Sequence, residues 1–443
     1  MLTYIKFFNH LVRIMDISYT LFISVCFPPS VDACAITVAK RLREWGQKID
    51  VISNKICRDE DPQLKLLTKN LVNNEKILTI PFTNLGSGLE MEEFASSCEL
   101  QLEQWKTQGL YDKMYSRALW PASHIAAIVY KTHFPKTKWS ADFSDPILYD
   151  IKGKQRFSPL TESWFQTYIA SNLKSINDKN LDLIVPDNKN AYLWSELMTY
   201  ILADELMFTN PNQLKFMVNG TLKEFRNLWG KQSIKTLKKW IMGKSKIAPH
   251  PTLPREFYNV CNTDHLQLKR KKGSKHIAYF GAFYDRRDIS NLIEPIDSFK
   301  DITIYLHIFT NNPPIYLKEL SKNHKRIILH EYLSYFDSLS AMTKFDAILV
   351  IDALITPVLG MNPYLPSKFS DCLGAGTPIW LITEKGSYLD KLDLATSPVF
   401  PFFSPFSSSP DKFDKFIKTS KIFRSRIGAA KQHLKILQTI RDS

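Results

Sequence analysis

The fold is decided by the stretch that begins Tyr19-Thr-Leu-Phe-Ile-Ser-Val25 and ends Ile49-Asp-Val-Ile-Ser53. Its first run is short and apolar and stops at Pro28-Pro29, which predicts a buried parallel strand followed by a loop. From Ala33 to Trp45 the apolar residues recur at helical spacing, and Gly46 stands where a helix commonly ends. A strand, a helix and a second strand within about 35 residues predict the βαβ unit that opens doubly wound folds.

The same alternation continues along the chain. Strands are predicted at residues 76–81, 138–142 and 205–209, helices at 90–105 and 195–203, and a further helix starts at Asn210-Pro211-Asn212. Residues 150–190 show no clear period. A second series of strand-like runs covers residues 276–280, 302–309, 326–329, 347–351 and 378–382. These runs alternate with helical pattern and predict a second parallel α/β sheet.

The length of 443 residues favours two domains. We expect an N-terminal domain over residues 1–268, a C-terminal domain over 269–410 and a helical segment over 411–443. The helical segment is predicted because residues 411–439 are amphipathic and basic after a linker rich in Phe, Pro and Ser at 397–410. Met15 stands just ahead of the first strand, so residues 1–14 can be an upstream extension.

The composition is that of a folded globular protein, with 44% hydrophobic and 23% charged residues, which excludes a disordered or fibrous class. The six cysteines form no Cys-x-x-Cys pair, so we expect neither a disulfide framework nor a zinc site, and a reducing cytoplasm fits best. The first 27 residues carry Lys6, Arg13 and Asp16 and precede no small-residue cleavage site, which argues against a signal peptide or membrane span.

Positive charge is concentrated between Pro211 and Lys275. This stretch holds fifteen Lys and Arg against three acidic residues, most of the net charge of +14. Such a surplus indicates an anionic partner, which could be phospholipid, a lipid-linked diphosphate, a nucleotide or nucleic acid. A solvated helix face is the alternative. The stretch contains no recognisable module with a platform of stacking aromatics, so no nucleic-acid partner is expected.

Ligands of open α/β sheets bind beyond the carboxyl ends of the strands, so the loops there are the candidate sites. The first is Phe27-Pro-Pro-Ser-Val-Asp-Ala33, in which Pro29, Ser30 and Asp32 lie between the first strand and the first helix. Its backbone N–H groups could receive a sugar acceptor or a donor phosphate. An ordinary βα loop is the alternative, since the glycine-rich dinucleotide fingerprint is absent.

The second candidate, Gly281-Ala-Phe-Tyr-Asp-Arg286-Arg287, follows the first strand of the second series. Arginine can clamp a diphosphate with two hydrogen bonds, although adjacent arginines on a loop are commonly surface charge.

The third and most specific candidate is the segment Pro363-Tyr-Leu-Pro-Ser-Lys-Phe-Ser-Asp-Cys-Leu-Gly-Ala-Gly-Thr-Pro378. Ser367 can cap a helix that Gly374 and Gly376 end. Lys368 in the first turn could hold phosphate together with backbone N–H groups, and Asp371 could accept a hydrogen bond from a ribose hydroxyl.

The fourth candidate is Trp139-Ser-Ala-Asp-Phe-Ser-Asp-Pro146, which places Asp142 and Asp145 at a strand end. These carboxylates could bind sugar hydroxyls or assist proton transfer, and a capped turn is equally consistent with the pattern.

With these four loops, the chain resembles the family-4 glycosyltransferases of the GT-B fold over most of residues 19–440, especially bacterial members that build capsule, O-antigen or related surface polysaccharide. The third segment is similar to the family's Pro-Ser-Lys-(Leu/Phe)-x-(Asp/Glu)-x-x-x-x-Gly-x-Pro motif. Phe345-Asp-Ala-Ile-Leu-Val350 resembles the strand before it, and Ala203-Asp-Glu-Leu-Met-Phe-Thr-Asn210 resembles an N-domain strand that approaches the cleft.

The resemblance implies two Rossmann-like doubly wound domains facing across a cleft, with a C-terminal helix. The N-terminal domain would take the acceptor and the C-terminal domain the nucleotide-sugar. By position, Gly281, Arg286 or Arg287, Ser367 and Lys368 would line the donor diphosphate, and Asp371 the ribose. Where many members of the family have a glutamate, this chain has Pro363, so contacts to the donor sugar must come from other residues.

His124 matches a family histidine near the transferred sugar, although a lone histidine in a helical stretch is commonly structural. With Asp145 it completes the predicted catalytic pair. The implied activity is transfer of a hexosyl or N-acetylhexosaminyl group to a glycan or lipid-linked acceptor, with retention of configuration.

The only Asp-x-Asp, Asp59-Glu-Asp61, lies well past the strand that ends at Ser53, so transfer without a metal or other cofactor is expected. The basic stretch would hold the protein on the inner face of the membrane. The alternatives are a nucleotide-sugar epimerase of similar fold and a catalytically silent protein that serves glycan assembly or binds nucleic acid.

Overall fold

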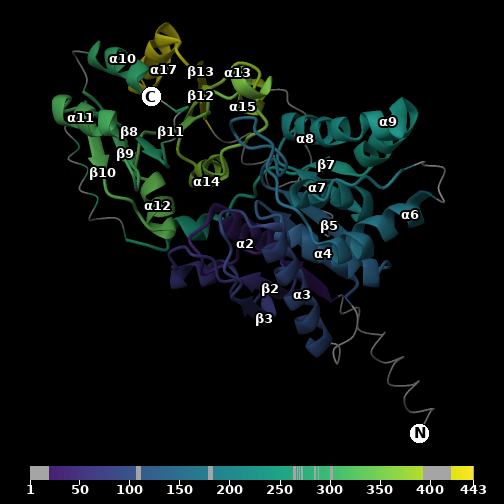
Figure 1. The fold of residues 1–443 in the computed structure, drawn as a ribbon. Coiled ribbons are helices and arrows are strands. Elements are labelled where there is room, and N and C mark those ends of the chain that lie inside the picture. The colour runs from purple at the N-terminus through teal and green to yellow at the C-terminus, as the bar shows by residue number, and fades with distance from the viewer. Residues whose placement is uncertain are drawn as a thin grey trace.

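The computed structural model describes residues 19–105, 111–177, 183–262, 266, 268, 270, 273–283, 286–287, 289–299, 303–392 and 421–442. Within these residues the chain forms two sheets in which all strand pairs are parallel. The N-terminal domain, purple to teal, and the C-terminal domain, green to yellow, lie side by side (Figure 1). The predicted α/β class with two Rossmann-like domains is confirmed.

The N-terminal sheet has seven strands in the described residues, in the order β3-β2-β1-β4-β5-β6-β7. This is the 3-2-1-4-5-6 order of a doubly wound dinucleotide-binding fold, extended by one strand. The bounds are Thr20–Ile23 for β1, Ile49–Asn54 for β2, Val72–Leu78 for β3, Lys113–Ala118 for β4, Lys138–Phe143 for β5, Glu205–Phe208 for β6 and Ser245–Ile247 for β7. Neither β4 nor β7 is among the strands predicted from the sequence.

The C-terminal sheet has six strands in the described residues, in the order β10-β9-β8-β11-β12-β13, which repeats the same topology. The bounds are Lys275–Phe280 for β8, Ile304–Phe309 for β9, Ile327–His330 for β10, Ala347–Ile351 for β11, Ile379–Thr383 for β12 and Ile422–Arg426 for β13. The strand β13 lies where a helical segment was expected. From Phe423 to Arg426 its residues alternate between an uncharged side chain and an arginine. The strand pairs in parallel with β12, from Ile379 to Thr383.

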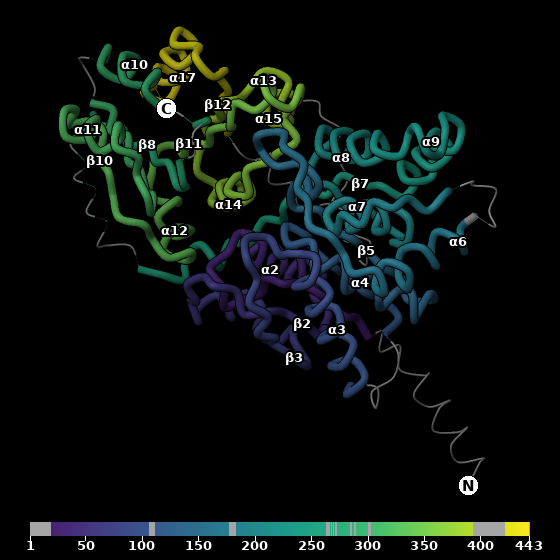
Figure 2. The backbone as a smooth tube through the Cα atoms, viewed as in Figure 1, coloured from purple at the N-terminus to yellow at the C-terminus, as the bar shows by residue number. Residues whose placement is uncertain are grey.

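Helices cover both sheets. Those of the N-terminal domain are α2 (Ala33–Trp45), η1 (Pro62–Leu67), α3 (Gly88–Trp105), α4 (Ala122–His133), α5 (Glu162–Trp164), η3 (Phe165–Ala170), α6 (Ser171–Asn177), α7 (Ala191–Leu202), α8 (Pro211–Glu224), α9 (Arg226–Gly243) and η4 (Arg255–Asn259). Those of the C-terminal domain are η5 (Ser290–Leu292), α10 (Ile293–Asp297), α11 (Ile315–Asn323), α12 (Tyr335–Met342), α13 (Thr356–Leu359), α14 (Lys368–Ala375), α15 (Tyr388–Lys391) and α17 (Ala430–Asp442). The last of these returns to lie beside α10 (Figure 2).

The helix α2 has the bounds that its apolar spacing predicts. Asp32 caps its first turn, where the carboxylate accepts a hydrogen bond of 2.7 Å from the backbone N–H of Cys34. Gly46 ends it in the left-handed conformation, with φ of 67°, and donates its N–H to the carbonyl of Leu42. Both ends of the helix are therefore fixed by local sequence.

The C-terminal sheet is buried on both faces because its strands are apolar at successive positions. Side chains on one face, among them Ile348 and Val350, pack in one core, and Leu349 and Ile351 pack in another on the opposite face. The first of these cores also takes in Ala39 of α2 and Leu64 of η1, which belong to the N-terminal domain. The two domains therefore share an apolar contact, at which α2 faces α14 (Figure 1).

The expected boundary between residues 268 and 269 falls in a region that is only partly described, and it stays a prediction. The segment that connects the two domains contacts the C-terminal domain before this boundary. Tyr258 in η4 donates a hydrogen bond of 2.7 Å to the backbone carbonyl of Asp371 in α14. The connecting segment is thus packed on the C-terminal domain before β8 begins.

Candidate functional site

Two acidic side chains follow neighbouring strands at the carboxyl edge of the C-terminal sheet. Asp352 comes directly after β11 and Glu384 directly after β12. One carboxylate oxygen of Asp352 accepts hydrogen bonds from the Glu384 N–H at 3.1 Å and the Ser387 hydroxyl at 2.6 Å. Burial raises the pKa of Asp352 to about 6. This carboxyl group can therefore exchange a proton near neutral pH.

Glu384 is more constrained than Asp352. Its Oε1 accepts hydrogen bonds from the backbone N–H groups of Ile355 at 2.9 Å and Thr356 at 2.7 Å. Its Oε2 is buried without a hydrogen-bond partner in the described residues. A buried acceptor without a partner is costly, so this oxygen calls for a partner that the described residues do not supply. Neither acid was predicted, although a polar residue directly after a buried strand is the signal that identifies both.

The predicted arginine pair lies against the same sheet edge. A guanidinium N–H of Arg286 points to the carbonyl of Leu354 at 3.4 Å, and the Leu354 N–H donates to the Arg286 carbonyl at 3.1 Å. Arg287 is close enough to Asp352 to lower the pKa of that carboxyl, against the larger effect of burial. The structure therefore brings both arginines to the end of β11. Gly281 follows β8, the strand next to β11.

Asp371 lies in the contact between the two domains. Its Oδ1 accepts hydrogen bonds of 2.8 Å from the ammonium group of Lys40 in α2 and from the hydroxyl of Tyr335 in α12. Lys40 also donates to the hydroxyl of Ser370 at 2.8 Å. The ion pair is almost completely buried, with side-chain exposures of 1% for Lys40 and 4% for Asp371. Burial lowers the pKa of Lys40, and Asp371 opposes that shift.

Lys368 begins α14, and its ammonium group lies 5.6 Å from the centre of the Tyr335 ring. It is also near enough to Lys40 to lower the pKa of that residue further. Cation–π contact with an aromatic ring leaves ammonium protons free to bind an anion. The position at a helix N-terminus agrees with the predicted phosphate contact, which stays a prediction.

The helix that carries these residues differs in two details from expectation. Ser367 precedes the helix but makes no capping hydrogen bond with its side chain. The helix runs on to Ala375, so Gly374 lies inside it and only Gly376, with φ of 69°, ends it. Gly374 is required for a different reason. A β-carbon at this position would lie 2.0 Å from the hydroxyl oxygen of Tyr258, which packs directly on the helix backbone.

In the N-terminal domain, the two carboxylates of the fourth motif have different surroundings. Asp142 is completely buried in an ion pair of 2.6 Å with Arg117, and the Tyr115 hydroxyl donates to it at 2.7 Å. Arg41 of α2 lies 3.7 Å from the same carboxylate. With its charge matched in this way, Asp142 holds β4, β5 and α2 together.

Asp145 lies beyond the end of β5 and makes no hydrogen bond or ion pair with the described part of the chain. Burial raises its pKa and Asp32 adds to that shift, whereas Arg117 and Arg156 lower the pKa. Its negative charge also acts on Tyr364 of the C-terminal domain, whose pKa is raised mainly by burial. The structure thus brings the predicted residues Asp145 and Asp32 near each other and near the opposite domain.

The loop that contains Pro29 and Ser30 does not offer the N–H groups that were expected. The Ser30 N–H donates to the Phe27 carbonyl at 3.1 Å, and the Val31 N–H donates to the Asp59 carbonyl at 2.8 Å. The neighbouring N–H of Asp32 donates to the Ser30 carbonyl at 2.9 Å. Because these donors are used within the protein, an acceptor at this loop would have to meet its side chains.

His124 is enclosed in the core of the N-terminal domain. Its Nδ1 lies 2.8 Å from the Ser116 hydroxyl, and its ring packs edge-on against Phe143 at 4.7 Å between centres. The side chain is 0% exposed, and burial lowers its pKa to about 3, so the ring is neutral. Its ring is packed among Ser116, Trp139 and Phe143 of strands β4 and β5, which favours the structural alternative for His124 over the catalytic one.

The start of α8 provides a second contact between the domains. The side-chain amide of Asn210 donates to the carbonyl of Pro363 at 2.9 Å. That of Asn212 donates to the carbonyls of Asn362 at 3.1 Å and Gly386 at 3.0 Å. The segment that was expected to approach the cleft, residues 203–210, therefore ends on the C-terminal domain. Pro363 contributes its backbone carbonyl there.

The structure also brings together three side chains that the sequence analysis did not associate. Cys26 follows β1, Asp32 caps α2 and Cys34 lies in the first turn of that helix. Their sulfur and carboxylate atoms all lie within 4.8 Å of one another, and all three residues are buried. Cysteine and aspartate at this separation can act as ligands of one metal ion.

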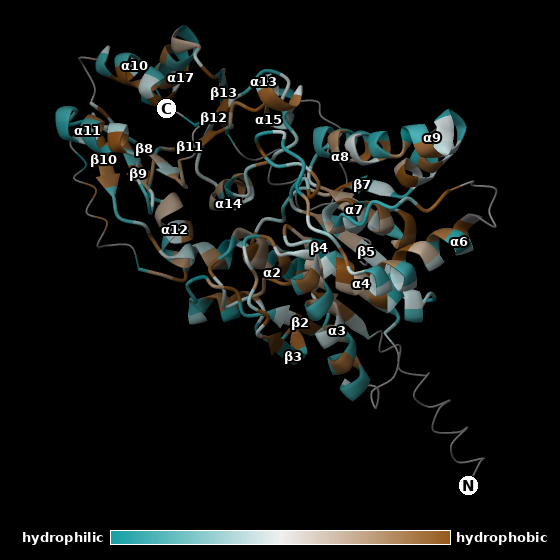
Figure 3. Ribbon diagram, viewed as in Figure 1, coloured by the Kyte–Doolittle hydropathy of each residue, from teal (hydrophilic) through white to brown (hydrophobic). Residues whose placement is uncertain are grey.

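The basic stretch forms exposed helix surface where it is described. Lys231, Lys235, Lys238 and Lys239 of α9 are exposed, as are Trp240 at 37% and Met242 at 43%. Hydrophilic residues mark the outward side of α9 (Figure 3). Residues 263–265, 267, 269 and 271–272 of the stretch lie outside the described residues. Among the helices of the described chain, each is either too short or too polar to span a bilayer.

Comparison with known proteins identifies similar structures but no sequence family. No protein-family model and no curated protein matches the sequence. Similar solved structures include sucrose-phosphate synthase from Thermosynechococcus elongatus, with 12% identity, a TM-score of 0.48 and coverage of 83% of this chain and 81% of that one. A glycosyltransferase from Rickettsia africae has 12% identity and a TM-score of 0.46, with 96% and 92% covered.

A UDP-N-acetylglucosamine 2-epimerase is also similar, with 12% identity, a TM-score of 0.44 and coverage of 95% of this chain and 86% of that one. All three TM-scores are below 0.5. The assignment of two Rossmann-like domains therefore stands on the strand order of the two sheets.

Proposed function

We propose that this protein is a glycosyltransferase that moves a sugar from a nucleotide-sugar to an acceptor bound between its two domains. The observation that carries the proposal is the contact between segments that follow strands of the two sheets, the start of α8 after β6 and the loop between β11 and α14. Lys40 and Asn210 of the N-terminal domain contact Asp371 and Pro363 of the C-terminal domain. Ligands of doubly wound sheets bind beyond the carboxyl ends of the strands.

The chemistry requires a charge complement for a departing nucleoside diphosphate. As the bond between the anomeric carbon and the phosphate oxygen breaks, negative charge grows on the phosphate and positive charge on the sugar. Arg286, Arg287 and Lys368 supply positive charge on the donor side. Glu384 is a candidate for a sugar hydroxyl, because it directly follows β12 and its Oε2 has no hydrogen-bond partner in the described residues.

Asp145 is the candidate for contact with the acceptor or for proton transfer. Its raised pKa makes it a stronger base than an exposed aspartate, and its carboxylate has no partner within the described chain. If transfer proceeds with retention, the leaving phosphate oxygen can take the acceptor proton on the same face of the sugar. The acceptor oxygen then forms the new bond to the anomeric carbon as the nucleoside diphosphate leaves.

The test is incubation of the purified protein with a panel of UDP-, GDP- and CMP-sugars, with release of free nucleotide as the readout. We expect slow release from one donor without acceptor. Lys368→Met should weaken binding of the matching nucleoside diphosphate by roughly tenfold to a hundredfold, because a charged hydrogen bond is lost. Lys391→Met, which removes an exposed lysine of the same domain, is the matched control. Unchanged binding in the Lys368 variant would contradict the donor site.

We further propose that the acceptor is a glycan or lipid-linked sugar of surface polysaccharide biosynthesis, and that α9 rests on the anionic inner face of the membrane. Exposed lysines beside Trp240 and Met242 combine charge with apolar side chains, as interfacial helices do. Each lysine near an anionic surface contributes about 1 kcal/mol. Vesicles that contain anionic lipid should therefore sediment the protein at low salt and release it at high salt.

The control for vesicle binding compares two triple Lys→Glu variants, one in α9 and one in the C-terminal domain. Changing Lys231, Lys235 and Lys239 to Glu should abolish sedimentation. Changing Lys318, Lys322 and Lys325 of the C-terminal domain to Glu alters the net charge equally and should leave most of the binding. Equal loss in both triple variants would show that total charge, not α9, attracts the vesicles, and this outcome would contradict the proposed surface.

The reaction products distinguish an epimerase of similar fold from a transferase. An epimerase converts the nucleotide-sugar without an acceptor, whereas a transferase forms a glycosidic product only when an acceptor is present. Product analysis with and without a mixture of lipid-linked acceptors therefore distinguishes the two activities. A new nucleotide-sugar isomer in the absence of acceptor would overturn the transferase proposal.

A further inference from the structure

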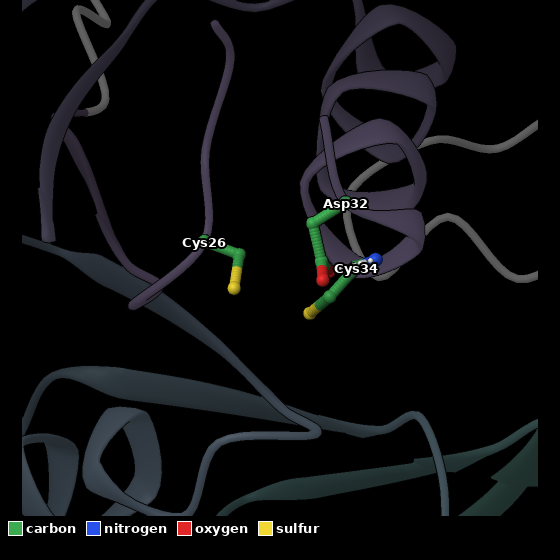
Figure 4. Close-up of side chains that lie close together, drawn as sticks. All are labelled: Cys26, Asp32 and Cys34. Carbon is green, nitrogen blue, oxygen red and sulfur yellow. Dashed lines mark hydrogen bonds between the residues drawn. The ribbon is translucent and has the colours of Figure 1, made fainter. Parts of the chain in front are cut away.

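We infer that Cys26, Asp32 and Cys34 form a binding site for one thiophilic divalent cation such as Zn²⁺. The three side chains converge from the loop after β1 and the first turn of α2 (Figure 4). The two sulfur atoms and a carboxylate oxygen lie within 4.8 Å of one another. This site is separate from the residues proposed to bind the donor.

The chain reaches this arrangement through a tight turn. Cys26 and Cys34 are eight residues apart, too far for a Cys-x-x-Cys motif, so their spacing gives no signal in the sequence. The hydrogen bond of 3.1 Å from the Ser30 N–H to the Phe27 carbonyl reverses the chain between them. The first turn of α2 then places the sulfur of Cys34 opposite that of Cys26.

The distances suit the geometry of zinc. Two sulfur atoms bound to one zinc ion at about 2.3 Å each lie roughly 3.8 Å apart in a tetrahedral site. A separation of no more than 4.8 Å therefore needs side-chain shifts of about 1 Å or less to reach it. Three protein ligands leave the fourth position to water or to another small ligand.

The charge balance also suits a dication. Binding replaces the two thiol protons by one ion of charge +2, so the cluster keeps the charge of −1 that the Asp32 carboxylate gives it. Arg58, whose Nε lies 3.9 Å from a carboxylate oxygen of Asp32, therefore faces the same charge in both states. The other carboxylate oxygen caps the helix through the Cys34 N–H, which fixes the orientation of the ligand.

The test uses the full-length reduced protein and Co²⁺ as a spectroscopic probe for the zinc position. We expect one Co²⁺ per chain, with a thiolate-to-cobalt charge-transfer band in the near ultraviolet, and displacement of the band by Zn²⁺. Cys26→Ser and Cys34→Ser should each remove most of the band. Cys57→Ser, which removes an exposed thiol of the same domain, is the matched control and should keep it.

A fourth variant guards against loss of folding. Asp32→Asn retains a residue that caps helices well but replaces the carboxylate by a poor ligand, so it should bind Co²⁺ more weakly by about tenfold or more with an unchanged circular dichroism spectrum. The inference is overturned if the wild-type protein shows no thiolate band, or if the band survives in both Cys26→Ser and Cys34→Ser. Loss of the band in Cys57→Ser would equally overturn it.

Discussion

Replacing Lys40 by Met should weaken the contact between the two domains more than any change of an exposed lysine. Lys40 is the only cation that the described residues pair with Asp371, and it lies in α2 while Asp371 lies in α14. Met has nearly the same length and apolar stem as Lys, so the variant removes the charge and its hydrogen bonds with little change in packing.

The magnitude follows from burial. The side chains are 1% and 4% exposed, so the variant leaves the Asp371 carboxylate in a site that water hardly reaches. Removing one partner of such a pair costs about 3 to 5 kcal/mol. The Tyr335 hydroxyl still donates to the carboxylate at 2.8 Å, so we expect the lower end, about 3 kcal/mol. This corresponds to roughly a hundredfold change in the equilibrium between folded and unfolded protein.

The assay is urea unfolding, followed by far-ultraviolet circular dichroism and by tryptophan fluorescence. The double variant Lys40→Met with Asp371→Asn should be more stable than Lys40→Met alone, because no unpaired charge remains. Lys65→Met is the matched control. It breaks the 2.6 Å pair with Glu75, which is partly exposed, and should cost no more than about 1 kcal/mol. A cost for Lys40→Met equal to that of Lys65→Met, or strictly additive effects in the double variant, would refute the reasoning.

Three further changes test other parts of the structure. Asp145→Asn should lower the rate of sugar transfer by about a hundredfold or more while nucleotide binding, measured by calorimetry, stays the same, and an unchanged rate would remove this residue from the mechanism. Glu384→Gln should raise KM for the donor sugar without weakening binding of the free nucleoside diphosphate, and equal losses for both ligands would argue against a sugar contact. Burial lowers the pKa of His307 to about 3 in the folded protein, so its ring is neutral there. In the unfolded protein the pKa is about 6.5. The neutral ring therefore contributes to stability fully above pH 6.5, and this contribution is lost as the pH falls below that value. At pH 5 the loss is about 2 kcal/mol, and His307→Gln should flatten the pH dependence of urea unfolding by that amount; the same slope in both proteins would contradict the assignment.

Much of the fold could be predicted because apolar runs and helix ends carry strong local signals. The bounds of α2 follow from its apolar spacing and Gly46, and the β11 and β12 strands follow from buried runs that nothing interrupts. The strands β4, β7 and β13 carry weaker signals. Arg117 and Ser116 make β4 polar, yet both side chains are buried because Asp142 and His124 bind them. A partner from another element can thus bury a polar strand that its own sequence does not identify.

The candidate site could be predicted only in part, because a sequence pattern describes neighbouring residues and not contacts with distant parts of the chain. Lys368, Asp371 and the arginine pair were predicted from local patterns, and their roles stay predictions. Lys40 was not predicted, since its role depends on a helix 331 residues further along the chain. The same limit explains why the N–H of Ser30 was expected to be available, whereas Asp352 and Glu384 could have been predicted from their positions directly after buried strands. The Ser30 N–H donates instead to the Phe27 carbonyl, within the turn that the loop makes.

The predicted ribose contact of Asp371 is compatible with its ion pair because a carboxylate has two oxygens. Oδ1 accepts the hydrogen bonds from Lys40 and Tyr335, and the described residues provide no hydrogen bond to Oδ2. A carboxylate has about four acceptor positions, so a ribose hydroxyl that reached Oδ2 would not have to displace Lys40. In that arrangement the nucleotide and the N-terminal domain are held by one side chain. Loss of Lys40 should then weaken nucleotide binding as well as stability, which joins the domain contact to the proposed donor site.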